Sequence, residues 1–168
     1  MPADSLRAVN EAAPERAAER FAACNASPSW VAAMVDGRPY ADAGSLLERG
    51  EQRARALPWE QIRQALDAHP RIGERAEGAT REATWSRQEQ AAVASSDDSA
   101  RVAFRAGNAA YERRFGHVFL IRAAGRSPEE MLGELRRRLD HDDERERDEV
   151  REQLAQITRL RLERMLDA

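Results

Sequence analysis

Residues 142–166 read DDERERDEVREQLAQITRLRLERML, and this stretch decides the fold class. Its inward positions recur every three to four residues along one side: Val150, Leu154, Ile157, Leu160 or Arg161, and Met165. That spacing is typical of a helix with one buried face. The sequence therefore predicts a long C-terminal helix over about 142–166.

The rest of the chain has the composition of a helical protein. Its 168 residues are 42% hydrophobic, 34% charged and only 5% aromatic. Ala, Leu, Arg and Glu are abundant and β-branched residues are few, which favours helix over sheet. No internal repeat or long linker divides the chain. We expect an all-α fold, formed as a single compact domain of about eight helices over residues 1–168.

Proline and serine mark where several of these helices begin. Pro14 and the pair Ser27-Pro28 suit the first turn of a helix. The run Ser127-Pro128-Glu129-Glu130 has the form of a capping box for a helix that ends near Asp140. Asn25 follows a helical pattern at the place of a C-cap, where Asn tolerates the left-handed conformation.

One segment is strand-like. Residues 118–121 read VFLI, the only run of this kind in the chain. A lone strand has no partner with which to exchange backbone hydrogen bonds. We therefore expect this segment to be a buried connection that crosses the core.

Charge and cysteine content exclude several classes of function. The net charge of −3 argues against a nucleic-acid-binding surface. All 27 basic residues are Arg, which excludes a Schiff-base lysine. The single cysteine, Cys24, is expected to be a buried, inert thiol, and no His/Cys cluster has the spacing of a zinc site. Without a secretory leader or a membrane-spanning apolar run, we expect a cytoplasmic protein.

Two short segments gather the residues best suited to chemistry. His69-Pro70-Arg71-Ile72-Gly73 follows a predicted helix, and a histidine there can exchange protons near neutral pH. After a polar stretch over 74–83, predicted to be a surface loop, comes Ser86-Arg87-Gln88-Glu89-Gln90. Thr84 or Ser86 is predicted to cap a helix here, and the backbone N–H groups of its first turn would suit an anionic ligand.

Both segments also have a purely structural interpretation. A single His before Pro is more often a turn or capping residue than a catalyst. Ser86 and Glu89 together form the capping box S-x-x-E, which stabilises a helix by about 1 kcal/mol. On composition and spacing alone, the structural interpretation is the stronger one.

The motifs, taken in order, resemble a known family. His69-Pro70-Arg71-Ile72-Gly73, Ser86-x-x-Glu89-Gln90 and Asn108-x-x-Tyr111-Glu112-x-x-Phe115-Gly116 closely resemble the signature of the 2-oxo-4-hydroxy-4-carboxy-5-ureidoimidazoline (OHCU) decarboxylases. Further similar blocks extend over about residues 17–165: Phe21-Ala22-x-Cys24 with Trp30, Met34 and Arg38-Pro39-Tyr40, then Val118-Phe119-Leu120-Ile121 with Gly125-Arg126-Ser127, then Ile157-x-x-Leu160-Arg161-Leu162. Several motifs in the right order are more specific than any one of them.

The resemblance implies an all-helical homodimeric enzyme, without metal or organic cofactor, that decarboxylates OHCU to (S)-allantoin in urate breakdown. It implies catalytic roles for His69 and Glu89. It also implies a set of substrate-binding residues: Pro70, Ser86, Gln90, Arg161 and, through backbone groups, Phe119 and Ile121. Arg159 lies two residues from Arg161 on a different helix face, so only one of the two can point inward.

Two other functions stay open from the sequence. A helical binding module that kept the fold without the chemistry would have the same Arg- and Glu-rich helix faces, although the intact set of site residues argues against it. A related enzyme could use the same pocket on a different ureido or heterocyclic acid, because a few contacts set substrate choice. Two positions depart from the family pattern: Asn25 stands in place of a Gly, and Tyr40 in place of a Phe-like residue.

Overall fold

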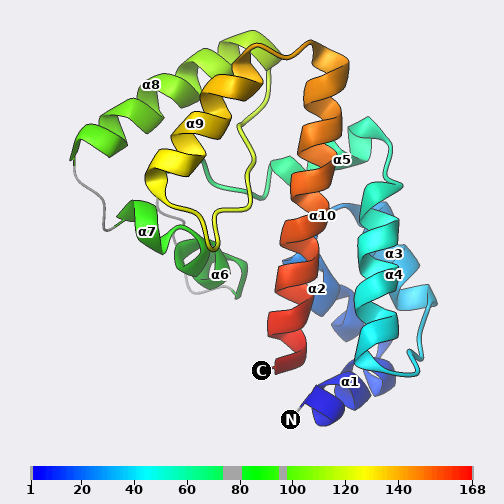
Figure 1. Ribbon diagram of the computed structural model, residues 1–168. Coiled ribbons are helices and arrows are strands. Elements are labelled where there is room, and N and C mark those ends of the chain that lie inside the picture. The colour runs from blue at the N-terminus through cyan, green and yellow to red at the C-terminus, as the bar shows by residue number, and fades with distance from the viewer. Residues whose placement is uncertain (1, 74–80, 95–97, 168) are drawn as a thin grey trace. The chain divides into compact units, whose positions relative to one another are not determined.

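The computed structural model describes residues 2–73, 81–94 and 98–167, and in these ranges the chain is helical and contains no strand. The predicted all-α fold is confirmed. The described part of the chain forms ten helices rather than about eight (Figure 1): α1 (Pro2–Glu11), α2 (Pro14–Cys24), α3 (Pro28–Asp36), α4 (Ala43–Arg55), α5 (Trp59–Leu66), α6 (Arg81–Glu89), α7 (Ala91–Ala94), α8 (Asp98–Phe115), α9 (Pro128–Leu139) and α10 (Asp143–Asp167).

The helices gather into two compact units. The first unit comprises Met1–Ala65 and Leu154–Ala168, and the second comprises Leu66–Gln153. The long helix α10 contributes its first part to the second unit and its last part to the first. That both units belong to one domain stays a prediction.

Helix starts in the first unit follow the predicted signals. Pro14 opens α2, and the Ser27 hydroxyl accepts a hydrogen bond from the Trp30 backbone N–H at 3.4 Å, with Pro28 as the first residue of α3. Asp42 caps α4 in the same way, through a bond of 2.7 Å from the Ser45 N–H. Each cap satisfies a backbone donor that the helix itself leaves unpaired.

Asn25 ends α2 differently from the prediction. Its φ of −156° is extended, so the expected left-handed cap is wrong. The side chain instead makes tertiary contacts: Nδ2 donates to the Thr158 hydroxyl at 3.2 Å, and Oδ1 accepts from the Ser27 N–H at 3.0 Å. Asn25 thereby joins the end of α2 to α10 and to the turn before α3.

Tyr40 is the second position that departs from the family pattern. Its hydroxyl donates to the Met34 carbonyl at 2.6 Å.

Gly50 lies where α4 packs closely against Trp30 and α10 in the first unit. The indole Nε1 of Trp30 donates to the Gly50 carbonyl at 3.0 Å. A Cβ at position 50 would overlap the Cδ1 of Leu162 in α10. Leu162 is fully buried, so it has little room to move. A glycine here allows α4, α10 and the Trp30 ring to approach one another.

Replacing Gly50 with Ala is therefore expected to lower the free energy of unfolding by about 1–3 kcal/mol, because the methyl group overpacks a buried contact. Urea denaturation monitored by circular dichroism measures the change. The matched control is Gly133→Ala in α9, where nothing lies within 4 Å of the added carbon. That variant is expected to gain up to about 1 kcal/mol from helix propensity. Equal effects at both positions would contradict the packing argument.

In the second unit, α8 and α9 lie side by side over a shared core (Figure 1). The core residues are Ile72, Val93, Phe104, Tyr111, Phe119, Ile121, Ala123, Met131 and Leu135. The Ser127 hydroxyl accepts from the Glu130 N–H at 3.1 Å, and α9 ends with Asp140 as its cap, which confirms the predicted start and end. Residues 118–121 form no strand, and three of the four are buried, which confirms a buried connection.

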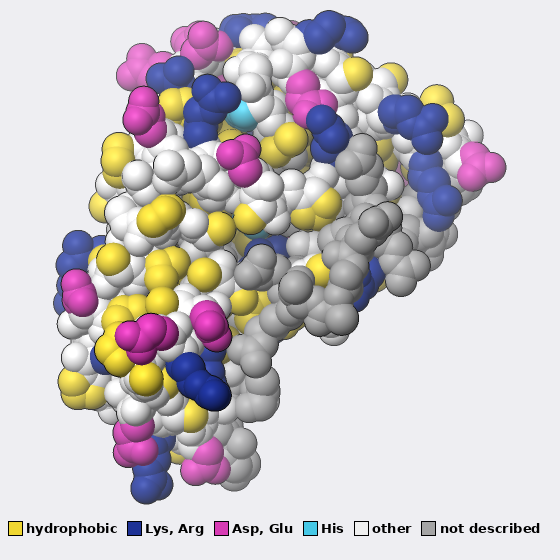
Figure 2. Space-filling view, turned by 180° about the vertical axis from the view of Figure 1, so that it is seen from behind, with side chains coloured by type: hydrophobic (Ala, Val, Ile, Leu, Met, Phe, Trp, Pro, Cys, Tyr) yellow, Lys and Arg dark blue, Asp and Glu magenta, His cyan; other side chains and the backbone are white. Residues whose placement is uncertain are grey.

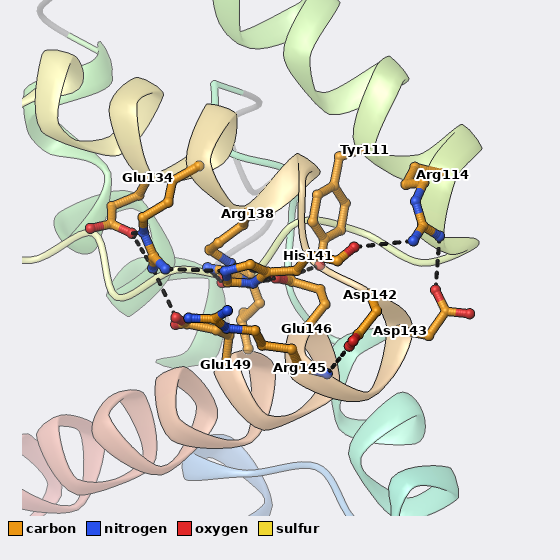
Figure 3. Close-up of polar contacts among 12 residues, drawn as sticks. Tyr111, Arg114, Glu134, Arg138, His141, Asp142, Asp143, Arg145, Glu146 and Glu149 are labelled. Carbon is orange, nitrogen blue, oxygen red and sulfur yellow. Dashed lines mark hydrogen bonds and ion pairs between the residues drawn. The ribbon is translucent and has the colours of Figure 1, made fainter.

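A buried ion pair links α9 to α10 in this unit. Arg138 and Glu146 have side chains that are 1% and 0% exposed, and their Nη2 and Oε2 atoms lie 2.6 Å apart (Figure 3). Arg138 also donates to the Leu120 carbonyl at 2.8 Å, and its guanidinium lies 4.6 Å from the centre of the Phe119 ring. Arg138 thus binds both α10 and the buried connection over residues 118–121.

Tyr111 and His141 complete the environment of Glu146. The Tyr111 hydroxyl donates to Glu146 Oε2, and His141 Nδ1 lies 3.2 Å from Oε1 (Figure 3). Burial raises the pKa of the Tyr111 hydroxyl well above its usual value, in spite of the nearby Arg138 charge. Tyr111 therefore stays a neutral donor, and both carboxylate oxygens of Glu146 have partners.

Glu146→Gln is expected to lower the free energy of unfolding by about 3–5 kcal/mol, because it leaves the Arg138 charge buried without a carboxylate. The control is Glu149→Gln, which breaks an ion pair of 2.8 Å with Arg137, whose side chain is 45% exposed. Exposed pairs contribute little, so the control is expected to lose at most about 1 kcal/mol. Chemical denaturation of both variants measures the difference. If both variants lose a similar free energy of unfolding, burial does not determine how much an ion pair contributes to the stability of this protein.

Charged side chains of both signs are interspersed over the face shown in Figure 2. Charged side chains of the described residues also form pairs one helical turn apart, such as Arg7 with Glu11 and Arg151 with Asp148. Within the described ranges, every helix is too short or too polar to cross a membrane.

Candidate functional site

The first predicted segment lies directly after α5. The His69 N–H donates to the Leu66 carbonyl at 2.9 Å, which places His69 in the turn that closes the helix, as predicted. His69 and Pro70 are partly exposed, whereas Ile72 is buried in the core of the second unit. Gly73 has a φ of 93°, a conformation that a residue with a Cβ rarely adopts. The segment therefore turns sharply just after its buried residue.

Gln90 joins the second predicted segment to the first. Its Oε1 accepts from the Gly73 N–H at 3.0 Å, and its Nε2 donates to the Arg71 carbonyl at 3.4 Å. These bonds connect residues that are far apart in the sequence. The structure thus brings the two motif segments together, as a shared site requires.

Two residues of α8, Asn108 and Glu112, also bind the first motif segment, at Ile72 and Arg71. Asn108 Nδ2 donates to the Ile72 carbonyl at 2.8 Å. The Arg71 Nε donates to both Glu112 carboxylate oxygens, at 2.9 and 3.1 Å. Asn108 and Glu112 are four residues apart and share one helix face. The sequence predictions missed both contacts, although the motif Asn108-x-x-Tyr111-Glu112 carried the spacing that produces them.

The helix that carries Ser86 and Glu89 differs from the prediction. It begins at Arg81 rather than at Thr84 or Ser86, and Glu89 is its last residue. Arg81-Glu82-Ala83 favour helix, so α6 extends further toward the N-terminus than the cap signals indicated. The capping box and the anion-binding helix start at Ser86 are therefore wrong. Of the predicted loop over 74–83, residues 81–83 are helical and 74–80 lie outside the described residues.

A cavity of about 1000 Å³ lies in the second unit. Its lining is Arg71, Ile72, Gly73, Ser86, Arg87, Gln90, Ala91, Val93, Arg101, Arg105, Asn108, Ala109 and Glu112. Four of these residues are Arg and one is Glu, so the lining is positively charged and suits an anion. Ser86 and Gln90 are predicted site residues. His69 and Glu89 are not among the described lining residues. In the sequence, His69 lies two residues before the lining residue Arg71, and Glu89 directly precedes the lining residue Gln90.

Phe119 and Ile121 lie in the buried connection, 2% and 3% exposed. The backbone beside them is held by side chains: the Leu120 carbonyl accepts from Arg138, and the Arg122 N–H donates to Gln153 Oε1 at 2.8 Å. The connection is therefore fixed within the second unit. That its backbone groups bind a ligand stays a prediction.

Arg161 belongs to the first unit, whereas the other predicted site residues belong to the second. It is 2% exposed, and its Nη1 donates to the Ala23 carbonyl at 3.4 Å. Arg159 is partly exposed and pairs with Glu51 at 2.9 Å and with Glu163 at 3.0 Å. Of the two arginines, Arg161 is the one that points inward. Its role in a substrate site stays a prediction.

No cluster of three or more His, Cys, Asp or Glu side chains that could hold a metal ion occurs within 2–73, 81–94 and 98–167. Cys24 is buried, as expected. The predicted site residues His69, Ser86, Glu89 and Gln90 carry an imidazole, a hydroxyl, a carboxylate and an amide.

Known proteins resemble this chain over most of its length. Two relatives are OHCU decarboxylases: that of Haloferax volcanii is 26% identical over 159 residues, which is 94% of each chain. That of Amia calva is 29% identical over 161 residues, 94% of this chain and 92% of the relative.

Two solved structures share the fold. A crystal structure of OHCU decarboxylase in the presence of (S)-allantoin has a TM-score of 0.75 at 24% identity and covers 88% of this chain and 97% of that one. A crystal structure of (S)-allantoin synthase has a TM-score of 0.70 at 18% identity and covers 95% of this chain and 53% of that one. The sequence profile of the OHCU decarboxylase family matches residues 10–163. The chain belongs to the OHCU decarboxylase family.

Proposed function

We propose that this protein decarboxylates OHCU to (S)-allantoin in urate breakdown, without a metal or an organic cofactor. The observation that carries the proposal is the pair of Gln90 hydrogen bonds to Arg71 and Gly73, which join the two motif segments into one site. The match of the family profile over residues 10–163 identifies the chemistry that such a site would perform.

The substrate itself explains why side chains are sufficient. Its carboxylate is attached to a carbon that bears a hydroxyl and lies next to a ring C=N bond. When the bond to the carboxylate breaks and CO₂ leaves, the two bonding electrons move into the C=N group, as in a β-keto acid. The carbon that lost CO₂ is then part of an enol: its hydroxyl loses a proton and becomes a carbonyl, and a proton is added to the neighbouring ring carbon, which belonged to the C=N bond and bears the ureido group. The protein needs to orient the carboxylate out of the ring plane and to stabilise the charge that reaches the ring.

We assign the proton transfers to His69 and Glu89. Glu89 would bind the substrate hydroxyl, and His69 would lie beside the departing carboxylate as the acid–base group. Addition of the final proton from one face only would give the single enantiomer (S)-allantoin. The position of His69 in a turn, next to the rigid Pro70, supports this assignment, because it restricts where the imidazole can lie.

The remaining contacts concern binding. Gln90 would bind the ureido group, with Ser86, Pro70 and the backbone at Phe119 and Ile121 forming the rest of the pocket in the second unit. A substrate-binding role for Arg161 is included on the family resemblance alone. An amide has two N–H donors and two carbonyl lone pairs. The Gln90 bonds to Gly73 and Arg71 use one of each, so Gln90 has the capacity to bind substrate as well.

The positive cavity beside these residues suits the anionic substrate. Ser86 and Gln90 are part of its lining, and Arg101 and Arg105 from α8 add charge. We include in the proposal that both units act as one functional domain, because the family profile spans both. A homodimer is also included on the family resemblance alone, and a cytoplasmic location as the sequence leads us to expect.

His69→Ala and Glu89→Ala are each expected to lower the turnover number by about 100-fold or more, because each removes a proton-transfer group. The assay is circular dichroism of allantoin, with OHCU made in place from urate by upstream enzymes. Because OHCU also decomposes spontaneously to racemic allantoin, the optical signal reports the enzymatic product only.

The matched controls are Asp67→Ala and Gln88→Ala, which change exposed neighbours of the two residues. Both are expected to keep full activity. Full activity in His69→Ala would reject its role. If the folded wild-type protein forms no optically active product, a binding module or a different ureido acid is the better explanation.

Arg105→Ser is expected to raise KM for OHCU about threefold at low ionic strength, because it removes one of the charges that attract the anion. The effect on the turnover number should be small. Raising the salt concentration should reduce the difference from wild type, since Arg105 is exposed and its charge is screened. Arg113→Ser, also exposed on α8 but outside the cavity lining, is the control. If KM rises equally in Arg105→Ser and Arg113→Ser, the effect comes from the net charge of the protein and not from the charge of the cavity lining.

A further inference from the structure

The segment after His69 is held by more side-chain bonds than a surface turn requires. Between them, Gln90, Asn108 and Glu112 bind the Arg71 carbonyl and guanidinium, the Ile72 carbonyl and the Gly73 N–H. Two of the three come from one face of α8. The family resemblance and the proposed chemistry give neither α8 residue a role.

Asn108 is the more informative of the two. It is 5% exposed, and its Nδ2 makes a buried bond of 2.8 Å to the Ile72 carbonyl. Its Oδ1 is buried and accepts no hydrogen bond from the described residues. An acceptor buried without a partner destabilises a fold, and a Leu of similar shape would avoid that loss. The value of an Asn here therefore lies in its N–H group, which holds the Ile72 carbonyl.

Glu112 acts on the same segment from one turn further along α8. Its carboxylate receives the Arg71 guanidinium at 2.9 Å, in a pair whose side chains are 46% and 26% exposed. An exposed pair contributes little to stability, so its main effect is on the direction of the Arg71 side chain. Glu112 and Asn108 together fix the two residues that follow Pro70.

We propose that Asn108 and Glu112 are positioning residues for His69, which hold residues 71–72 on α8 and so fix the direction of the imidazole. The proposal rests on the proposed function of His69. The chain from Leu66 to Ile72 is held at both ends: the Leu66 carbonyl binds the His69 N–H, and α8 binds residues 71–72. Pro70 lies between these anchors and has a fixed φ, so little backbone freedom is left to His69.

Asn108→Leu is the main test. It removes the buried acceptor that has no partner but leaves the Ile72 carbonyl without the Asn108 donor, so we expect a folded protein of somewhat lower stability. Because small misplacements of a reacting group reduce the rate strongly, the turnover number should fall about tenfold or more, with KM within about twofold of wild type. Glu112→Gln, in a partly exposed position, should give a smaller fall of the same kind.

Tyr111→Phe is the matched control. It removes one buried hydrogen bond from the same helix, the bond to Glu146, and leaves the segment after His69 untouched. We expect it to lower stability and to keep the turnover number. If Tyr111→Phe lowers the turnover number as much as Asn108→Leu does, the effect is a general loss of packing and the proposal is wrong.

A double-mutant cycle separates positioning from structure. In the His69→Ala background, Asn108→Leu should cause no further loss of optically active product, because the residue that it positions is absent. A merely structural role would give the same fractional loss in both backgrounds. That result would overturn the proposal.

A measurement without catalysis keeps this inference separate from the proposed function. NMR of the wild-type protein and the Asn108→Leu and Tyr111→Phe variants reports the His69 ring resonances and the hydrogen exchange of the Gly73 amide. Asn108→Leu should shift the His69 signals and speed exchange at Gly73, whereas Tyr111→Phe should do neither. Unchanged His69 and Gly73 signals in Asn108→Leu would reject the positioning role even if the enzyme is active. An inactive wild-type protein with the expected NMR changes would reject the proposed function alone.

Discussion

Buried backbone outside the helices has to obtain its hydrogen bonds from side chains, and this constraint organises the second unit. In an all-α protein the helices satisfy their own backbone groups, but a connection through the core has no neighbouring strand to pair with. The Leu120 carbonyl is bound by Arg138, and the Arg122 N–H by Gln153. In the same way, Asn108 binds the Ile72 carbonyl. One polar side chain from each of α8, α9 and α10 supplies these bonds: Asn108, Arg138 and Gln153.

The same constraint explains why a buried ion pair lies beside the connection. Arg138 needs a carboxylate if its charge is to be buried, and Glu146 supplies it at 2.6 Å. The guanidinium has five N–H donors, enough to bind Glu146 and the Leu120 carbonyl at once. A lysine has a compact charge and lacks this planar geometry.

Stability and the proposed chemistry are therefore connected through the irregular segments. The segment after His69 and the segment that contains Phe119 and Ile121 both pack into the same core cluster. Both include residues of the proposed site, and both depend on supporting side chains, Asn108 for the first and Arg138 for the second, to which the proposal gives no catalytic role. A substitution in the supporting side chains would change the geometry of the site before it unfolded the protein, because the two segments have no other regular structure to hold them.

The sequence by itself determined the helices whose signals are local. The periodicity of residues 142–166, the proline at the start of α2 and the serine caps of α3 and α9 act over one or two turns, so they predict the structure correctly. The order of the motifs likewise identified the family. Local signals failed at Ser86, where good helix formers extend α6 beyond the apparent cap, and at Asn25.

Only the tertiary structure decided which polar side chains act together. Asn25 binds Thr158 instead of adopting a left-handed cap, because a residue far along the chain offers a better partner for its amide. The choice of Arg161 over Arg159 for the inward position required the packed helix, in which only one face is buried. The bonds from Gln90, Asn108 and Glu112 to residues 71–73 also join positions 17 to 41 residues apart. Spacing along a helix predicts which residues share a face, but packing alone determines what that face contacts.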